Sequence, residues 1–400
     1  MNASRFAKAL AGQWTATLYA AAISTLLSFA LGRVLGPEAF GAYTYVLTLA
    51  SLFSIVQDGG FAPVIFRETA HPSDHFPPAA SLMSLGLGHL LTVSLGGLVL
   101  VWFCPFDHKQ ALFLAVGYYA LYGAGNFLSA SLKGQGRFQD EAAWRVKTRT
   151  LTAMGIGLVL TLPQPSINAL FAACLAGQAA AMLLPSARPA WPRPGLNLDK
   201  SLYRSCGAFM LISSATTIYF RSDIVILAQL TDQYQVGQYA AAYRLVDAAT
   251  MICMPLTHIF FRMLRVNLHS QATFKRSLRL MLVSMSALGL AGTGLGLWLG
   301  PWIIKLAFGS QYGQAQLLCM WLVPAFIFIL PNGVLTQAIM AIGREGFYAW
   351  VTVAVAVANI GLNLALVPLL GAKGSALATI ASEALLMAGL ILGFRRGKRT

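Results

Sequence analysis

Charged side chains are scarce in this sequence, and acidic ones are the scarcest. Of the 400 residues, 10% are Asp, Glu, Lys or Arg and 57% are apolar, with 13 acidic against 28 basic residues. A soluble domain carries about 25% charged residues, so this composition excludes an ordinary soluble protein. Because apolar segments of ~20 residues follow one another with hardly a gap, we predict a membrane protein.

Cysteines and enzyme motifs are also few. The five cysteines lie in or beside apolar runs, without CxxC spacing or the density of a disulfide framework, so we interpret them as packing residues. His71 and His75 lie four apart in HPSDH, but the proline and the loop position favour a solvated turn over a metal site. GQGRF has too few glycines for a phosphate-binding loop. We therefore predict no enzymatic activity, no metal site and no cofactor.

Basic residues follow a topological pattern instead. The net charge is +15, yet no Lys/Arg stripe with interleaved aromatics is present, which argues against nucleic acid as a partner. With the N-terminus in the cytoplasm, the inner ends and loops hold 22 of the 28 basic residues, in agreement with the positive-inside rule. We therefore expect both termini to be cytoplasmic and the inner face to attract anionic membrane lipid.

Twelve apolar segments are long enough to cross ~30 Å of hydrocarbon at ~1.5 Å per residue of helix. The expected fold is an all-α polytopic membrane protein. The predicted spans are roughly 12–32, 40–64, 79–103, 110–132, 145–163, 166–186, 205–230, 237–261, 278–299, 315–341, 347–369 and 374–394.

The longest hydrophilic stretch, rich in Pro and Arg, divides these spans six and six. We predict an N-terminal lobe over residues 1–187, a cytoplasmic linker over 188–204 and a C-terminal lobe over 205–400. An even number of spans in each lobe makes the two lobes parallel repeats, as in transporters built from two equal halves.

Two pairs of motifs support this internal repeat. A shift of 196 places FGAY at 40–43 on VGQY at 236–239, and GQGRF and AIGREGF fall in corresponding inner loops. In RVLGPEAFGAY, Pro37 and the flanking glycines predict a sharp outer turn between the first two spans. Tyr43 and Tyr239 are then expected at the headgroup level, in the aromatic belt.

Four stretches that together span nearly the whole chain carry a family resemblance: LGRVLGPEAFGAYTYVLTLASLFSIVQDGGF with the later FRE, LKGQGRF, RSDIVILAQLTDQYQVGQYAAAYRLVDA and NIGLNLALVPLLGAKGSALATIASE. In order and placement they resemble the polysaccharide-transport branch of the multidrug/oligosaccharidyl-lipid/polysaccharide exporter superfamily, which includes O-antigen flippases. The resemblance implies two six-helix lobes around a central cavity and transfer of undecaprenyl-pyrophosphate-linked oligosaccharide to the outer leaflet. It also implies a bacterial cytoplasmic membrane protein that works beside polysaccharide polymerases and glycosyltransferases.

Five charged residues lie inside spans of the second lobe. Arg221, Asp247 and Glu383 each lie ten residues from an outer turn, about 15 Å deep at ~1.5 Å per residue. Asp223 and Arg244 lie slightly nearer the outer surface. Because a charge at this depth costs at least ~2.5 kcal/mol, each should face a cavity or a partner.

Two interpretations of these charges stay open. Arg221 and Arg244 could bind the pyrophosphate and acidic sugars of the substrate, since a guanidinium stays charged and forks onto phosphate oxygens. Alternatively, Arg244 and Asp247, three apart on one helix, neutralise each other. Asp223, Asp247 and Glu383 are candidates for coupling to a proton or sodium gradient, or for fixing helix packing.

Further candidates lie near the two faces of the membrane. Arg33 and Arg67 could guide an anionic substrate at the two mouths, although topology alone also explains Arg67. Asp58, followed by two glycines, is either another ion-coupling residue or a cap at a helix break. Headgroup capture and topology are both open explanations for the densest inner basic cluster, which contains Lys133, Arg137, Arg145, Lys147 and Arg149.

The sequence therefore predicts a two-lobed secondary transporter that moves an anionic, lipid-linked oligosaccharide outward by alternating access. The alternative is an exporter of drugs or small metabolites from the same superfamily, against which Arg221 and Arg244 count. A membrane glycosyltransferase or ligase would need a large outer loop with catalytic acids, and no outer loop exceeds about fifteen residues. A scaffold would not need charges at mid-membrane.

Overall fold

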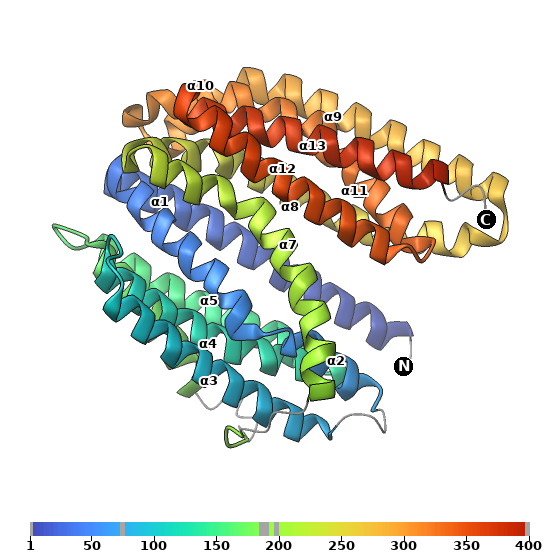
Figure 1. The fold of residues 1–400 in the computed structure, drawn as a ribbon, viewed down its shortest axis with the longest axis horizontal. Coiled ribbons are helices and arrows are strands. Elements are labelled where there is room, and N and C mark those ends of the chain that lie inside the picture. Colours follow the sequence, from blue (N-terminus) through green and yellow to red (C-terminus); the bar gives the residue numbers. More distant parts are fainter. Residues whose placement is uncertain (1–2, 73–76, 184–191, 196–199, 397–400) are drawn as a thin grey trace. The chain divides into compact units, whose positions relative to one another are not determined.

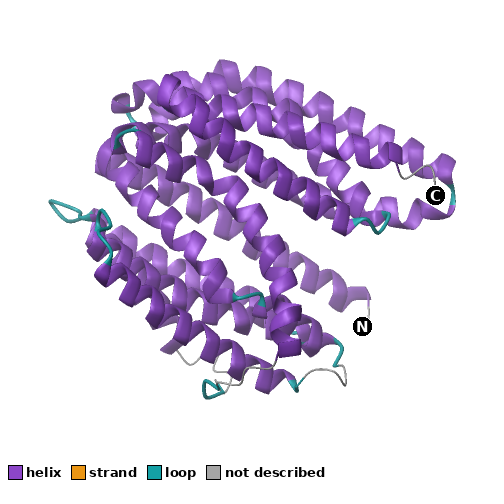
Figure 2. Ribbon diagram, viewed as in Figure 1, coloured by secondary structure: helices purple, strands orange, loops and turns teal. Residues whose placement is uncertain are grey.

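The structure, a computed structural model, consists of α-helices and three short 3-10 helices over the residues it describes, 3–72, 77–183, 192–195 and 200–396 (Figure 2). No strand occurs in these ranges, and the prediction of an all-helical chain is confirmed. The helices are α1 (Ala3–Asp58), α2 (Phe61–Ala70), α3 (Ala79–Phe103), α4 (Lys109–Gly134), α5 (Phe138–Leu160), α6 (Ile167–Leu183), α7 (Lys200–Leu230), α8 (Gln233–Val266), η2 (Asn267–His269), α9 (Gln271–Phe308), η3 (Ser310–Tyr312), α10 (Gly313–Leu322), η4 (Val323–Ala325), α11 (Phe326–Ala341), α12 (Glu345–Leu370) and α13 (Ala372–Arg396) (Figure 1).

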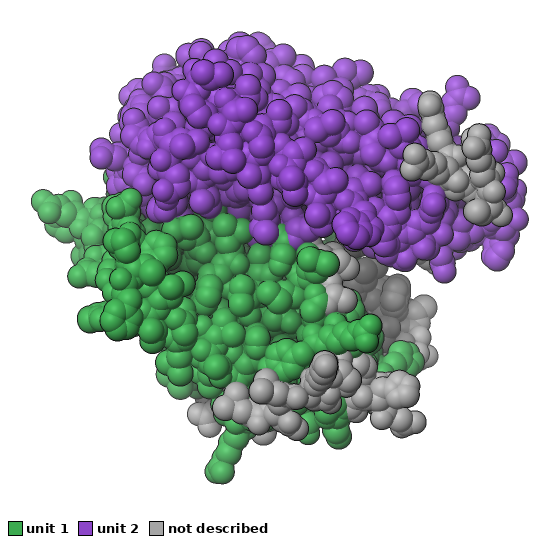
Figure 3. Space-filling view, viewed as in Figure 1, with its two compact units in different colours: residues 1–34, 46–214 green, residues 35–45, 215–400 purple. Residues whose placement is uncertain are grey.

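The chain forms two compact units, which Figure 3 colours separately. Unit 1 comprises residues 1–34 and 46–214, and unit 2 comprises residues 35–45 and 215–400. The change from unit 1 to unit 2 therefore falls inside α7, and a short stretch of α1 belongs to unit 2. Part of the predicted linker 188–204 lies outside the described residues, so the predicted lobe boundaries stay a prediction.

Eight segments in the described part of the chain are long and apolar enough to cross a membrane. One is α1, which covers the predicted span 12–32 and most of the predicted span 40–64. Another runs from η3 to α11 and covers the predicted span 315–341. Helices α5, α6 and α8 overlap the predicted spans 145–163, 166–186 and 237–261. The helices thus correspond to all twelve predicted spans.

The predicted span 40–64 is interrupted near its end. Helix α1 ends at Asp58 and α2 begins at Phe61, because Gly59 and Gly60 take left-handed φ angles of 57° and 81°, which other residues rarely adopt. Asp58 Oδ2 accepts a hydrogen bond from the Gly60 amide at 3.1 Å. The carboxylate therefore closes the turn between the two helices, as the capping interpretation of Asp58 expects.

The break inside α1 lies where the sequence predicts a turn. Gly36 has φ 75° and ψ 170°, outside the helical region, and Pro37 follows it, at a position where its missing amide hydrogen costs least. Phe40 is then buried, and its ring lies 5.9 Å from that of Phe308 and 6.4 Å from that of Tyr312. This packing explains why residues 35–45 belong to unit 2.

Two glycines related by the 196-residue shift face each other within unit 2. A Cβ placed on Gly41 would lie 2.8 Å from the Gly237 nitrogen and would collide with the Gln233 carbonyl. A Cβ placed on Gly237 would lie 3.1 Å from the Gly41 nitrogen and would collide with the Pro37 carbonyl. Pro37 and Gln233 are related by the same shift. The contact is therefore symmetric, and only small residues let two helices approach this closely.

The second pair of repeated motifs forms the same turn twice. After α4, the amides of Gly136 and Arg137 donate to the carbonyls three and five residues back, and after α11 the amides of Gly343 and Arg344 do the same. The two glycines have φ angles of 73° and 74°. This arrangement is a Schellman motif, which ends a helix with a left-handed glycine. The corresponding inner loops of the predicted repeat therefore share one backbone structure.

Each unit has its own apolar core. In unit 1, α2, α3, α4 and α7 pack around buried residues that include Phe61 and Phe127, and in unit 2, α8, α9 and α11 pack around residues that include Met281. By contrast, Trp350 and Leu369 are 76% and 79% exposed. Large apolar side chains directed outward are expected where a helix contacts lipid.

Replacing Gly237 with alanine should destabilise the protein, because the added methyl group collides with the helical stretch that carries Pro37 and Gly41. Overpacking of this kind costs about 1–3 kcal/mol, so thermal unfolding in detergent should give a lower Tm. Gly294→Ala is the control, since Gly294 lies in α9 with open space around it and alanine favours a helix by about 1 kcal/mol. A Gly237→Ala variant as stable as the wild type would contradict the close crossing.

Candidate functional site

The charged residues predicted at mid-membrane lie in unit 2, on α7, α8 and α13. Asp223 of α7 is buried, and its carboxylate accepts hydrogen bonds from the Tyr239 hydroxyl at 2.5 Å and from the Ile224 amide at 2.8 Å. Tyr239 is itself fully buried, so its predicted place in the aromatic belt is wrong. Instead of facing the lipid headgroups, its hydroxyl donates to the buried Asp223 carboxylate, which would otherwise lack this hydrogen bond.

Glu383 of α13 joins three helices through its carboxylate. Its oxygens accept hydrogen bonds from the Tyr219 hydroxyl of α7 at 2.7 Å and from the Asn332 amide of α11 at 2.8 Å. The same Asn332 nitrogen also lies 2.9 Å from the Glu383 carbonyl. The side chain is 4% exposed, so these donors replace the water that it has lost.

Arg244 and Asp247 lie one turn apart on α8 and form an ion pair, with an N–O distance of 3.4 Å. Their side chains are 24% and 33% exposed. The structure therefore shows the internal pairing that was one of the two predicted arrangements. A role of Arg244 in substrate binding stays a prediction.

Arg221 differs from the other charges of this cluster. Its side chain is half-buried on α7, and in the described part of the chain it makes no ion pair and no side-chain hydrogen bond. The neighbouring Ser222 hydroxyl instead donates to Asn359 Oδ1 at 3.1 Å. Arg221 is therefore a cation within a predicted span that forms no ion pair with the described residues, and its role in substrate binding stays a prediction.

Amide side chains extend this polar cluster between α12 and α13. Asn359 donates to the Ser382 hydroxyl at 3.0 Å, and Asn363 donates to the Asn359 carbonyl at 2.9 Å. Oδ1 of Asn363 and Oδ1 of Asn332 are buried and have no hydrogen-bond partner among the described residues. Among the described residues, no three or more His, Cys, Asp or Glu side chains come together as metal ligands.

Unit 1 contains a separate polar site, a cavity of about 230 Å³ between α1, α4, α5 and α6. Lys133, Glu141, Arg145 and Arg149 line it, together with aromatic and amide side chains. The cavity brings Arg149, a predicted substrate ligand, together with two other members of the inner basic cluster.

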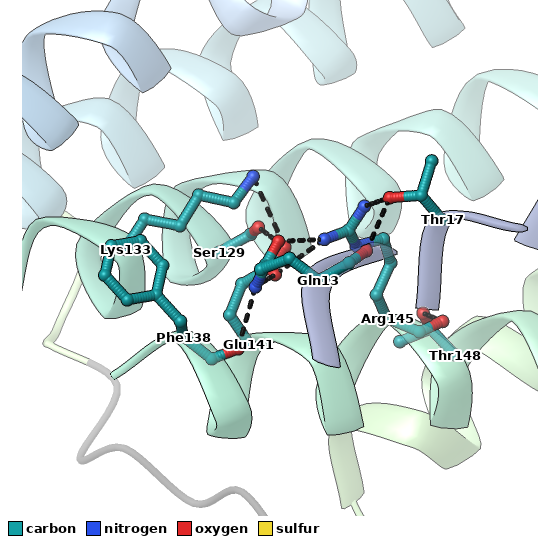
Figure 4. A network of polar contacts seen from close by, with 8 residues as sticks. All are labelled: Gln13, Thr17, Ser129, Lys133, Phe138, Glu141, Arg145 and Thr148. Carbon is teal, nitrogen blue, oxygen red and sulfur yellow. Dashed lines mark hydrogen bonds and ion pairs between the residues drawn. The ribbon is translucent and has the colours of Figure 1, made fainter. Parts of the chain in front are cut away.

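Glu141 is the hub of this site (Figure 4). Its side chain is 1% exposed and lies 2.8 Å from Arg145 and 3.3 Å from Lys133. It also accepts hydrogen bonds from Ser129 and Gln13, each at 2.6 Å. The sequence predictions did not include Glu141, although its spacing of four from Arg145 on one helix was a visible signal.

These contacts change the acidity of Glu141, which lies in the first turn of α5, ahead of the predicted span 145–163. Burial raises its pKa, but the hydrogen bonds from Ser129, Arg145 and Gln13 and the charge of Lys133 outweigh burial. The pKa therefore lies below its ordinary value of 4.5, so the carboxylate is ionised at neutral pH.

The remaining predicted site residues lie apart from these two clusters. Arg33 is an exposed residue of α1. Arg67 of α2 pairs with the buried Glu68 at 2.8 Å, and its guanidinium lies 6.0 Å from the centre of the Phe209 ring. Asp58 closes the turn before α2. Substrate guidance by the arginines and ion coupling by Asp58 stay predictions.

A comparison with family models decides the family. The model described as "Polysaccharide biosynthesis protein" matches residues 13–263, which is more than half of the chain. The chain belongs to the polysaccharide biosynthesis protein family. This confirms the predicted resemblance to the polysaccharide-transport branch of the exporter superfamily.

Relatives and solved structures agree with this assignment. The probable low-salt glycan biosynthesis flippase Agl15 of Haloferax volcanii is 22% identical over 383 residues, which cover 92% of this chain and 79% of that protein. The inward closed conformation of the lipid II flippase MurJ aligns with a TM-score of 0.74 and 11% identity, over 96% of this chain and 87% of the other. An inward-facing multidrug resistance MATE transporter aligns with a TM-score of 0.66 and 14% identity, over 96% and 94% of the two chains.

At 11% and 14% identity, the likeness to these two solved structures is evidence for the fold alone. The chain is a multi-pass membrane protein with twelve membrane helices in two six-helix lobes, as predicted.

Glu141→Gln should lower the stability of the protein at neutral pH, because it leaves Lys133 and Arg145 without their shared carboxylate. The lost charge-assisted hydrogen bonds are worth about 1–3 kcal/mol. Since the folded pKa lies below 4.5, the stabilisation is present above that pH and is lost as the pH falls through the folded value. The difference in Tm between wild type and Glu141→Gln should therefore be large at pH 7 and shrink below pH 4.5.

Asp140→Asn is the matched control, since Asp140 pairs with Arg137 at the surface, with side chains 53% and 55% exposed. Such a pair contributes at most about 1 kcal/mol, so its Tm should hardly change. A Glu141→Gln variant that behaves like this control at pH 7 would show that the network does not stabilise unit 1.

Proposed function

We propose that this protein is a flippase that moves an anionic, lipid-linked oligosaccharide from the inner to the outer leaflet by alternating access. Membership of a polysaccharide biosynthesis family supports a glycan as cargo. The names of two similar proteins, a glycan biosynthesis flippase and a lipid II flippase, support a lipid-linked form of it. Undecaprenyl pyrophosphate is the carrier that the sequence resemblance implies.

One observation supports a negative charge on the proposed substrate. Arg221 is a half-buried cation in a membrane helix, and in the described residues no carboxylate pairs with it, whereas Asp223, Asp247 and Glu383 all have other partners. A charge at this depth is costly unless something balances it. A pyrophosphate supplies the balance, because a guanidinium binds phosphate oxygens in a bidentate manner. Cationic drugs, the cargo of the alternative exporter, would be repelled.

The proposed site binds its substrate by electrostatic attraction and catalyses no reaction. Arg221 binds the pyrophosphate inside the membrane, and Arg244, held by Asp247, is a second cation on the neighbouring helix. Asp223, Asp247, Glu383 and Asp58 are the proposed coupling residues for a proton or sodium gradient. Of these, Asp247 is the best placed, since it is the most exposed of the three mid-membrane acids and shares its partner Arg244 with the proposed substrate.

The proposed setting is the cytoplasmic membrane of a bacterium, with both termini in the cytoplasm. There the protein would receive its cargo from glycosyltransferases and deliver it to a polysaccharide polymerase on the outer face. The excess of basic residues on the predicted inner loops supports this orientation.

Arg221→Ala should abolish the export of surface polysaccharide in cells that depend on this protein, while its amount in the membrane stays normal. Arg221→Lys should retain part of the activity, because the charge remains without the bidentate geometry. Arg276→Ala is the control, since Arg276 is an exposed basic residue of α9 and should export normally. Normal export by Arg221→Ala would show that Arg221 is not part of the site. If cells without the protein accumulate no more lipid-linked sugar than wild-type cells, the alternative of a small-molecule exporter would be favoured.

If transport is coupled to a proton or sodium gradient, as proposed, transport of the lipid-linked oligosaccharide in vesicles should stop when both gradients are dissipated. Asp247→Asn should then transport at the same low rate with or without a gradient, because the neutral amide cannot exchange a cation or a proton. Asp140→Asn, at the surface of unit 1, should keep the full gradient dependence. Undiminished transport by the wild type in gradient-free vesicles would argue for passive scrambling instead.

A further inference from the structure

The cavity of unit 1 carries more positive charge than its own residues balance. Three cations line it, Lys133, Arg145 and Arg149, against the single carboxylate of Glu141. Because the cavity is small and partly enclosed, an uncompensated charge within it interacts more strongly with an anion than a charge at an open surface does. The lining therefore favours a ligand with negative charge.

Glu141 is already occupied by two of these cations. It lies 2.8 Å from Arg145 and 3.3 Å from Lys133, and its remaining hydrogen-bonding capacity goes to Ser129 and Gln13. These contacts, drawn in Figure 4, hold Lys133 and Arg145 in place in the lining of the cavity. Among the described residues, the buried Nε of Arg145 has no hydrogen-bond partner, so the protein does not use all the donors of this guanidinium.

Arg149 lies one helical turn beyond Arg145 on α5 and points to the same cavity. It is half-buried, and in the described part of the chain it has no ion pair and no side-chain hydrogen bond. A topological signal in an inner loop needs only to be exposed to water. A half-buried guanidinium in a cavity that already holds two cations is not explained by topology.

The other residues that line the cavity suit a hydroxylated ring. Tyr118 and Tyr122 lie with ring centres 6.1 Å apart and planes inclined by 32°, and the buried Trp144 adds a third aromatic surface. Asn126 and Gln178 contribute amide groups to the same lining. Aromatic faces beside donors and acceptors are what a sugar can use, since one face of the ring is apolar and its edge carries hydroxyl groups.

From these features we propose that the cavity of unit 1 binds a phosphate group together with the sugar attached to it, with Arg149 as the principal phosphate ligand. At about 230 Å³ it is smaller than the ~300–1,000 Å³ of sites for drug-sized ligands, so it accepts one end group rather than a whole oligosaccharide. The inference rests on the proposed function, because a lipid-linked oligosaccharide presents this junction of phosphate and sugar. The glycerol phosphate headgroup of an anionic lipid presents similar chemistry.

The test is binding of soluble probes to the purified full-length protein by isothermal titration calorimetry. Glucose 1-phosphate should bind, and glucose, which lacks the charge, should bind at least tenfold more weakly. Arg149→Gln should weaken glucose 1-phosphate at least tenfold, and Arg149→Lys should lie between. Arg137→Gln is the matched control, because Arg137 belongs to the same inner basic cluster but pairs with Asp140 outside the cavity. Equal affinity in wild type and Arg149→Gln, or no binding to the wild type, would overturn the proposal.

A second arm distinguishes the two sources of the phosphate. The titration is repeated in nanodiscs of zwitterionic lipid with and without phosphatidylglycerol. A lower affinity of the wild type for glucose 1-phosphate in the discs with phosphatidylglycerol than in the zwitterionic discs would assign the cavity to a lipid headgroup, and an equal affinity in both would assign it to the glycan carrier. Export by Arg221→Ala tests the proposed flippase function, and glucose 1-phosphate affinity in Arg149→Gln tests this site, so a failure of the one and a failure of the other give different results.

Discussion

A buried carboxylate needs hydrogen-bond donors in place of the water it has lost, and in this protein neighbouring helices supply them. This requirement organises both polar clusters. Asp223 is bound by a tyrosine of α8, Glu383 by a tyrosine of α7 and an asparagine of α11, and Glu141 by residues of α1, α4 and α5. In each case the donors come from different elements, so the hydrogen bonds fix how those helices pack within their own unit. The polar groups are thus part of the fold as well as of the site.

Because the buried carboxylates already have hydrogen-bond partners, some basic side chains are left without an ion pair among the described residues. With the buried carboxylates occupied, Arg221 in unit 2 and Arg149 in unit 1 are half-buried cations for which the described residues supply no ion pair. The chain has 13 acidic against 28 basic residues, so its deficit of negative charge is general, and these two cations are half-buried. The proposed anionic cargo would supply the missing negative charge to both cations.

Close backbone contact is the second constraint on unit 2. Gly41 and Gly237 let two helical stretches from distant parts of the chain cross without side chains between them. Because the stretch 35–45 packs with α8 and α9, a segment of α1 is part of unit 2. A repeat in the sequence here becomes a symmetric contact in the structure.

Much of the fold follows from local sequence signals. Hydropathy predicts the spans, Gly36 with Pro37 predicts the break in α1, and the glycines of GQGRF and AIGREGF mark two helix ends with the same hydrogen bonds. Contacts between distant residues were not predictable. Glu141 and Gln13 are 128 residues apart, and nothing local to Tyr239 indicates that Asp223 needs its hydroxyl. A tyrosine near a helix end has the same local signal whether it faces a headgroup or a buried carboxylate.

In the proposed function, Arg221, a cation without an ion pair among the described residues, binds an anionic, lipid-linked cargo. This proposal is tested most directly by reconstituting the purified protein in vesicles that carry undecaprenyl-pyrophosphate-linked oligosaccharide and following its exposure to a membrane-impermeant sugar-modifying reagent. We expect the wild type to move the lipid-linked sugar across the bilayer and Arg221→Ala to leave it in place, at equal protein content. Equal rates for the two proteins, or no movement by either, would contradict the proposal.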